Sequence, residues 1–191
     1  ISSFLIIMAT HLAVGKIPKC FWKNLNHQRQ AFDTLAKERN IVDASGWYKL
    51  HTKTLLSHRG ITSILNNYYK GCLYKALTSL YPDQRFEFWK FVRVPKHFWT
   101  DKVFQKQFLD SVEKTLGIEH KDGWYSVDGK RIKELGGGSL LYYFGGSVPL
   151  TLAQVYPEYN WKMWLFKDPP SKYWEDSKNQ RAFMDWLAGE L

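Results

Sequence analysis

The sequence contains only two cysteines, Cys20 and Cys72, among its 191 residues. Two isolated thiols form neither a disulfide framework nor a zinc site, so we expect an intracellular protein, nuclear or cytoplasmic. The six histidines have no His-x-x-x-His or Cys-x-x-Cys neighbours, and the chain has no P-loop and no Gly-x-Gly-x-x-Gly motif. The sequence therefore predicts no metal, no cofactor, no small-molecule substrate and no enzymatic activity.

Long apolar runs are also absent. The most apolar stretch lies in residues 1–17, around Phe4–Met8, and it is too short to span a bilayer and contains His11. It has no basic segment or cleavage site typical of a signal peptide, so no membrane partner is expected. We interpret residues 1–17 as the remnant of a preceding repeat. The alternatives are a linker ahead of a start at Met8, or an apolar segment that packs on the first repeat.

Aromatic residues, by contrast, are abundant, with nine Trp and eleven Tyr, and they recur at regular distances. A Pro is followed three residues later by an aromatic pair at Pro18, Pro95 and Pro170. A Trp-Tyr pair begins at Trp47 and again at Trp124, and a Tyr-Pro followed by Trp-x-Phe also occurs twice, with offsets of 75 to 77 residues. Such self-similarity is the signature of a repeat architecture.

The offsets predict a tandem repeat of small units of about 76 residues each. We expect residues 1–17 as the N-terminal segment, 18–94 as the first copy, 95–169 as the second copy, and 170–191 as a partial third copy. The partial copy is expected to form a helix that caps the second, because the ends of a repeat array need covering. We interpret the recurring Trp residues as core, since each copy needs the same packing.

The periodicity favours a mainly α fold. In the second copy Phe104, Phe108, Val112 and Leu116 recur every four residues, which is one face of a helix. We expect this first helix to end near Asn40 or Gly117 and Asp101, Glu175 and Asp176 to cap helix starts. Further short helices are expected at 52–59, 62–69 and 73–80, and at 128–135, 139–144 and 149–155.

Two local features bear on function. Gly60 and Gly137 are expected to separate helices in a helix-turn-helix-like arrangement. The cluster at 136–138 is expected to be a flexible turn with Ser139 as N-cap, and an anion-binding turn is the alternative. We expect the Trp-x-Phe segments to be short extended straps, with a strand fragment as the alternative.

The second copy resembles a tandem repeat found in many uncharacterised eukaryotic proteins, especially fungal and protist ones. The resemblance extends from Pro18 onward and rests on Trp124, Tyr125, Gly137, Gly138, Ser139, Leu140, Leu141, Tyr143, Tyr156, Pro157, Glu158, Trp161, Trp164, Phe166, Trp174, Asn179, Gln180, Arg181 and Phe183. The first copy departs from it at Asp83, Phe86 and the single Gly60. Repeats of that group often precede a restriction-endonuclease-like domain. These 191 residues contain no such domain, so the resemblance implies a targeting module and not the cleaving part.

Acidic residues are scarce in the first copy. Residues 18–94 hold thirteen Lys and Arg and five Asp and Glu, a net charge of +8. Residues 95–169 hold ten and nine, a net charge of +1, and residues 170–191 have a net charge of −1. If the protein binds a polyanion such as DNA, we therefore expect the first copy to make most of the contacts.

Exposed cations and stacking aromatics are the candidate ligand-binding residues. Adjacent tyrosines on one helix cannot both face inward, which favours one of each Tyr pair as a base-stacking surface. The candidates are Lys53, Arg59, Lys70, Lys75, Lys130, Arg131, Tyr69 and Tyr142. We expect a non-catalytic nucleic-acid-binding repeat module, with DNA as the expected ligand. Because few cations match between the copies, a protein-interaction scaffold without a nucleic-acid role is the alternative.

Overall fold

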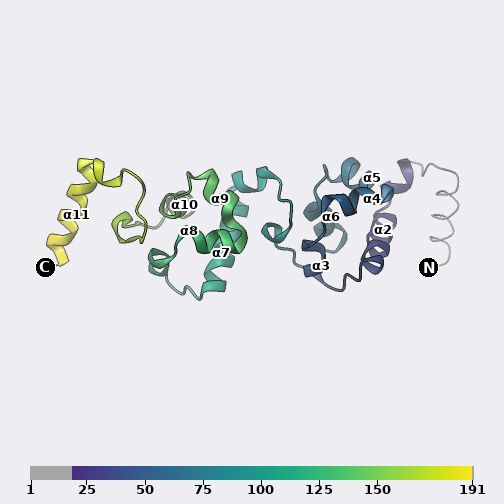
Figure 1. Cartoon of the computed structure of the whole chain (residues 1–191), viewed down its shortest axis with the longest axis horizontal. Coiled ribbons are helices and arrows are strands. Elements are labelled where there is room, and N and C mark those ends of the chain that lie inside the picture. The colour runs from purple at the N-terminus through teal and green to yellow at the C-terminus, as the bar shows by residue number, and fades with distance from the viewer. Residues whose placement is uncertain (1–18, 191) are drawn as a thin grey trace. The chain divides into compact units, whose positions relative to one another are not determined.

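The computed structural model describes residues 19–190, apart from the side chains of Lys19, Thr52, Lys53, Leu56 and Arg59. The segment 1–17 lies outside these residues. The chain divides into two compact units, Ile1–Val94 and Pro95–Leu191, called unit 1 and unit 2 below. Regular structure between residues 19 and 190 is helical, without a β-strand, which confirms the predicted mainly α fold (Figure 1).

Apart from η5, and from η7 and α11 at the end of the chain, the described helices follow one another in a similar order in the two units. Unit 1 contains η1 (Lys19–Lys23), α2 (Leu25–Glu38), α3 (Ala44–Tyr48), α4 (Thr52–Ser57), α5 (Arg59–Tyr68), α6 (Leu73–Leu80) and η2 (Phe88–Lys90). Unit 2 contains η3 (Lys96–Thr100), α7 (Lys102–Leu116), η4 (Lys121–Ser126), α8 (Gly129–Ile132), the π-helical η5 (Lys133–Gly137), α9 (Gly138–Tyr143), α10 (Val148–Val155), η6 (Met163–Leu165), η7 (Tyr173–Glu175) and α11 (Ser177–Glu190).

The long helices α2, α7 and α11 begin in the same way. The side chains of Asn24, Asp101 and Asp176 each accept a hydrogen bond at 2.9 Å from the backbone N–H two residues later, which satisfies one free donor of the first turn. Capping by Asp101 and Asp176 was predicted and is confirmed. The breaks after α2 and α7 are also as predicted, with left-handed φ values of 53° at Asn40 and 67° at Gly117.

A glutamine in each long helix holds the preceding aromatic pair. The side-chain amide of Gln28 donates to the Trp22 carbonyl at 2.6 Å. The same bond joins Gln105 to Trp99 at 2.8 Å, and Gln180 to Trp174 at 2.7 Å. Gln28 and Gln105 are buried, so this bond satisfies a polar group that would otherwise be costly to bury.

The recurring tryptophans are core residues with some exceptions. Trp22, Trp47, Trp99 and Trp124 are at most 4% exposed, which confirms the core interpretation for them. Their burial excludes them as stacking surfaces for a ligand. Trp174, in contrast, is 43% exposed, and Trp89 and Trp164 are half-buried.

The prediction that Gly60 forms a turn is wrong. The helix break lies at His58 (φ −99°, ψ 97°), and Gly60 lies inside α5. A Cβ at Gly60 would lie 3.2 Å from a ring carbon of Trp22, so the glycine allows a buried indole to approach the helix. In unit 2 the break is at Gly136, whose φ of 96° favours glycine.

Two further local predictions differ from the structure. Ser139 lies inside α9 and is not its N-cap, because that helix continues directly from Gly137. The Trp-x-Phe segments are only partly extended. Trp89 and Trp164 lie in 3₁₀ turns, and the extended backbone is confined to the phenylalanine that follows each turn. Phe91 and Phe166, the phenylalanines in question, are both buried.

Candidate functional site

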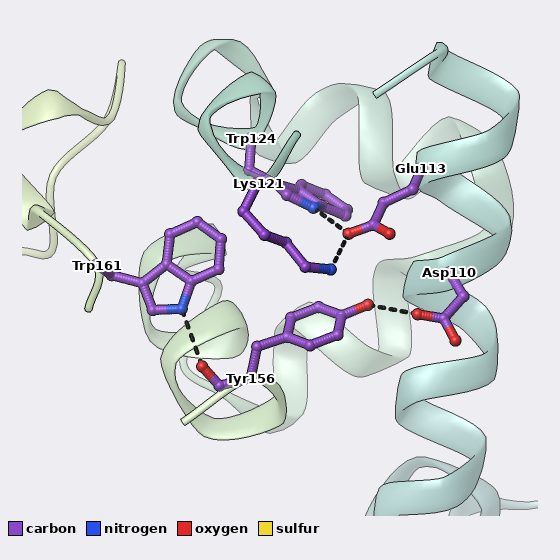
Figure 2. Close-up of polar contacts among 6 residues, drawn as sticks. All are labelled: Asp110, Glu113, Lys121, Trp124, Tyr156 and Trp161. Carbon is purple, nitrogen blue, oxygen red and sulfur yellow. Dashed lines mark hydrogen bonds and ion pairs between the residues drawn. The ribbon is translucent and has the colours of Figure 1, made fainter. Parts of the chain in front are cut away.

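The tyrosine of each Tyr-Pro turn is fixed to the first helix of its unit. The Tyr81 hydroxyl donates to Asp33 Oδ1 at 2.6 Å, and the Tyr156 hydroxyl donates to Asp110 Oδ1 at 2.8 Å (Figure 2). Burial, and then the carboxylate, raise the pKa of both phenols well above the ordinary value. These tyrosines are therefore neutral hydrogen-bond donors and are not poised for acid–base chemistry.

A cation lies over each of these tyrosine rings. The Arg29 guanidinium is 4.9 Å from the centre of the Tyr81 ring, and Lys106 Nζ is 5.7 Å from the centre of the Tyr156 ring. Such cation–π contacts stabilise the packed ring and still leave the cation at the surface. The residues of the two contacts are related by the offsets of the predicted repeat, and in each unit a Tyr-Pro tyrosine contacts an aspartate and a cation.

Unit 2 has an additional polar cluster around Glu113. Its carboxylate accepts a hydrogen bond from Trp124 Nε1 at 2.7 Å and forms an ion pair with Lys121, whose Nζ lies 3.6 Å from the centre of the Tyr156 ring (Figure 2). The aligned residues of unit 1 are Ala36 and Ala44. The cluster is partly buried and its members bind one another, so it stabilises unit 2 and offers no group to a substrate.

Unit 2 also contains a groove of about 520 Å³. Its lining includes the apolar residues Val148, Pro149 and Phe166 together with charged residues of both signs. The lining residues are Val127, Asp128, Gly129, Lys130, Lys133, Gly145, Gly146, Ser147, Val148, Pro149, Phe166, Asp168, Pro169, Pro170 and Ser171. The backbone N–H of Arg131, and then Lys167, lower the pKa of Asp128, which keeps this carboxylate ionised.

Two of the residues that line the groove are glycines with left-handed backbone. Gly145 and Gly146 have φ values of 69° and 81°, and the N–H of Gly146 donates to the Leu141 carbonyl at 2.7 Å. In unit 1 the same turn is made by Lys70 and Gly71, with φ values of 51° and 73°. Lys70 therefore stands where unit 2 has Gly145.

Another lining position, Asp168, has the opposite charge in unit 1. Lys167 N–H donates to the Tyr125 carbonyl at 3.0 Å, which places the next residue, Asp168, on the groove. In unit 1 the equivalent bond joins Val92 N–H to the Tyr48 carbonyl at 3.3 Å, so Arg93 follows it in place of Asp168.

A third lining position is acidic in unit 2 but not in unit 1. His51 precedes α4 as Asp128 precedes α8. The groove positions that carry Asp128, Gly145 and Asp168 in unit 2 thus correspond to His51, Lys70 and Arg93 in unit 1. We take these three unit 1 residues as the candidate site and call them the basic triad.

The predicted cations differ in their settings. The side chains of Lys53 and Arg59 lie outside the described residues. Lys70 and Lys75 are exposed near the start of α6, and Lys130 is exposed on the groove of unit 2. Arg131 is exposed and forms an ion pair with Glu134 at 3.1 Å.

The two predicted tyrosines lie in different environments. Tyr142 is 87% exposed. Tyr69 is half-buried, and its hydroxyl donates to Gln28 Oε1 at 2.7 Å, so it is fixed to α2, whereas its neighbour Tyr68 is 39% exposed. His51 and Arg93 were not among the predicted site residues. The sequence signal that could have identified Arg93 is the reversal of charge between aligned positions, since Arg93 of unit 1 aligns with Asp168 of unit 2.

Residues 19–190 contain no group of three or more His, Cys, Asp or Glu side chains that could hold a metal ion. Over the same part of the chain, no helix is both long and apolar enough to cross a membrane. Comparison with known proteins gives no match to a family model, to a curated protein or to a solved structure.

Proposed function

We propose that this chain is a non-catalytic nucleic-acid-binding repeat module, with DNA as the expected ligand and unit 1 as the contacting unit. The proposal rests on the difference in charge between three positions that line the unit 2 groove and the positions of unit 1 that align with them. Unit 2 has Asp128, Gly145 and Asp168 there, whereas unit 1 has the basic triad. The resemblance to repeats that precede restriction-endonuclease-like domains supports a targeting role.

The side chains of the triad suit phosphate contacts. His51, Lys70 and Arg93 are all exposed, so binding a phosphate would not require them to leave the core. Arginine and lysine neutralise backbone phosphates and release the counterions condensed on DNA, which supplies most of non-specific affinity. Contacts of this kind position a protein on DNA without reading its sequence.

The backbone at Lys70 supports a functional reason for this lysine. Its φ of 51° lies in the left-handed region, where a residue with a Cβ is disfavoured and where unit 2 has a glycine. A lysine in this conformation lowers the stability of the fold. Binding of a ligand by its exposed side chain therefore explains the lysine better than packing does.

In the proposed function, unit 2 makes a smaller contribution to binding through its exposed aromatic side chains. Tyr142 is 87% exposed and Tyr143 is 52% exposed. Each ring offers a face on which an unpaired base can stack. A preference for single-stranded over duplex DNA would therefore depend on Tyr142, while overall affinity would depend on unit 1.

The test is fluorescence anisotropy of labelled duplex and single-stranded DNA with the full chain at about 50 and 200 mM salt. We expect submicromolar binding at the lower salt concentration and a steep loss at the higher one. The double variant Lys70→Gly with Arg93→Asp installs the residues of unit 2. It should reduce the salt slope for duplex DNA by about 1.8, since each lost phosphate contact contributes about 0.9.

The matched control makes the reverse exchange in unit 2. Gly145→Lys with Asp168→Arg should strengthen binding, because it gives the unit 2 groove the charges of unit 1. No binding by the parent chain at about 50 mM salt would favour a protein-interaction scaffold instead. If the parent and the unit 1 double variant bound DNA with equal affinity, the basic triad would not be part of the interface.

A further inference from the structure

The last helix, α11, buries none of its residues. The corresponding first helices of the full units are packed into their cores. α2 buries Gln28, Ala31, Phe32 and Leu35, and α7 buries Gln105, Phe108, Leu109 and Val112. These two sets align with Gln180, Phe183, Met184 and Leu187 of α11.

The start of α11 is nevertheless built like the start of a full unit. Asp176 caps it, and Gln180 donates to the Trp174 carbonyl at 2.7 Å, as Gln28 and Gln105 do to their tryptophans. The difference begins one turn later. Met184 is 60% exposed, whereas the aligned Phe32 and Leu109 are at most 1% exposed. The face that forms a core in α2 and α7 is thus only partly covered in α11.

One side of α11 is already occupied within unit 2. Phe183 and Trp186 pack against Trp164, with ring centres 5.9 and 5.7 Å apart, and Lys162 Nζ lies 5.2 Å from the centre of the Trp186 ring. These contacts hold the helix in place. Met184 and Leu187 lie on the neighbouring stripe, at the helical spacing of the aligned core residues.

The polar residues beside this stripe indicate what would cover it. Arg181 aligns with Arg29 and Lys106, the cations over the Tyr-Pro tyrosines, and Asp185 aligns with Asp33 and Asp110, the acceptors of their hydroxyls. Both Arg181 and Asp185 are exposed. α11 therefore carries the cation and the carboxylate that would hold a Tyr-Pro tyrosine.

We propose that the face formed by Gln180, Arg181, Met184, Asp185 and Leu187 docks the remaining part of a repeat unit. The occupant is a polypeptide segment of the kind found at residues 118–169, with a Trp-Tyr turn, short apolar helices and a Tyr-Pro turn, but without a first helix of its own. Its tyrosine hydroxyl binds Asp185 and its ring packs under Arg181. This surface is independent of the proposed nucleic-acid binding.

A second copy of the chain does not fit this face. The hydroxyls of both Tyr-Pro tyrosines, Tyr81 and Tyr156, already donate to aspartates within their own units. A second copy would have to unfold one of its units to offer either tyrosine. A segment without a first helix has no such competing partner.

The test extends the full chain after Leu191 with a second copy of residues 118–169 and follows hydrogen exchange of the α11 amides. We expect exchange in α11 to slow at least about tenfold, because docking orders a helix face that is now open. Asp185→Ala, or Met184→Glu, in the extended chain should return exchange toward the rate of the parent. Asp185→Ala in the unextended parent is the matched control and should leave exchange unchanged.

Three outcomes would overturn the proposal. The first is unchanged exchange in α11 although the extension is helical by circular dichroism. The second is an extension that adds no helix, because docking on α11 is what should complete its fold. The third is a parent chain that sediments as a dimer and becomes monomeric on Met184→Glu, since a second copy would then be the occupant.

Discussion

Asp33 accepts a hydrogen bond from the hydroxyl of Tyr81, 48 residues further along the chain, at 2.6 Å. The bond joins the first helix of unit 1 to the turn that follows α6, and Asp110 and Tyr156 make the same connection in unit 2. Two segments distant in sequence are thereby fixed at the edge of each core, beneath a cation that covers the tyrosine ring.

Removing either hydroxyl should destabilise the protein. Tyr81→Phe and Tyr156→Phe should each lower the free energy of unfolding by about 1–2 kcal/mol, as expected for a partly exposed hydrogen bond to a charged acceptor. Urea denaturation followed by tryptophan fluorescence measures the change. Tyr142→Phe, at a tyrosine that is 87% exposed, is the control and should change it by less than about 0.5 kcal/mol. Equal effects of all three variants would contradict the structural role.

The Glu113 cluster should behave as a coupled set. Glu113→Ala removes the acceptor of buried Trp124 and the partner of Lys121, and should lower the free energy of unfolding by about 1–3 kcal/mol. Adding Lys121→Ala converts both positions to the alanines of unit 1. The double variant should therefore cost less than the sum of the two single variants, with a coupling of at least about 0.5 kcal/mol in a double-mutant cycle. Additive effects would show that the two charges do not depend on each other.

The sequence correctly predicts the ends of those helices that are set by residues close to them in the chain. Helix α6 spans Leu73–Leu80, as predicted, because Pro82 excludes helical backbone from the residue before it. The caps at Asp101 and Asp176 follow from the same local rules. The role of Gly60 does not follow from local rules, because it depends on the Trp22 ring, 38 positions earlier in the sequence.

The candidate site was harder to predict than the fold. The sequence shows that Lys70 and Arg93 are cations, but their correspondence to the groove residues Gly145 and Asp168 depends on backbone bonds such as Val92 N–H to the Tyr48 carbonyl. Those bonds connect segments that are far apart in sequence. Tyr69 was selected as a stacking residue from its helix position, although its hydroxyl is fixed to Gln28 on another helix. The burial of a side chain and its hydrogen-bond partners on another helix are set by the folded unit, and neighbouring residues in the sequence do not reveal them.

Alkaline pH should weaken the fold through the tyrosine–carboxylate bonds. The hydrogen bond to Asp122, at 2.6 Å, raises the pKa of Tyr159 from 10 to about 12. Because the folded pKa is the higher one, this bond contributes fully below pH 10, and its contribution is lost as the pH rises from 10 through 12. The tyrosinate absorbance of the folded protein should show a phenol that titrates near 12 and disappears in Tyr159→Phe. Asp122→Asn should move that titration toward 10, and an unchanged titration would contradict the assignment.

Lys70 offers a way to separate stability from binding. Lys70→Gly relieves a left-handed φ of 51° that costs a lysine roughly 1–2 kcal/mol, while the glycine adds unfolded-state entropy worth about 0.5–1 kcal/mol. The free energy of unfolding should therefore stay the same or rise by up to about 1.5 kcal/mol. DNA affinity should fall nonetheless, because one phosphate contact of unit 1 is lost. Urea denaturation and fluorescence anisotropy on the same preparation measure the two quantities. Lys70→Ala is the control, since it loses the charge but keeps the strained backbone. If only Lys70→Gly lost affinity, the backbone at this turn, and not the charge, would be what binding requires.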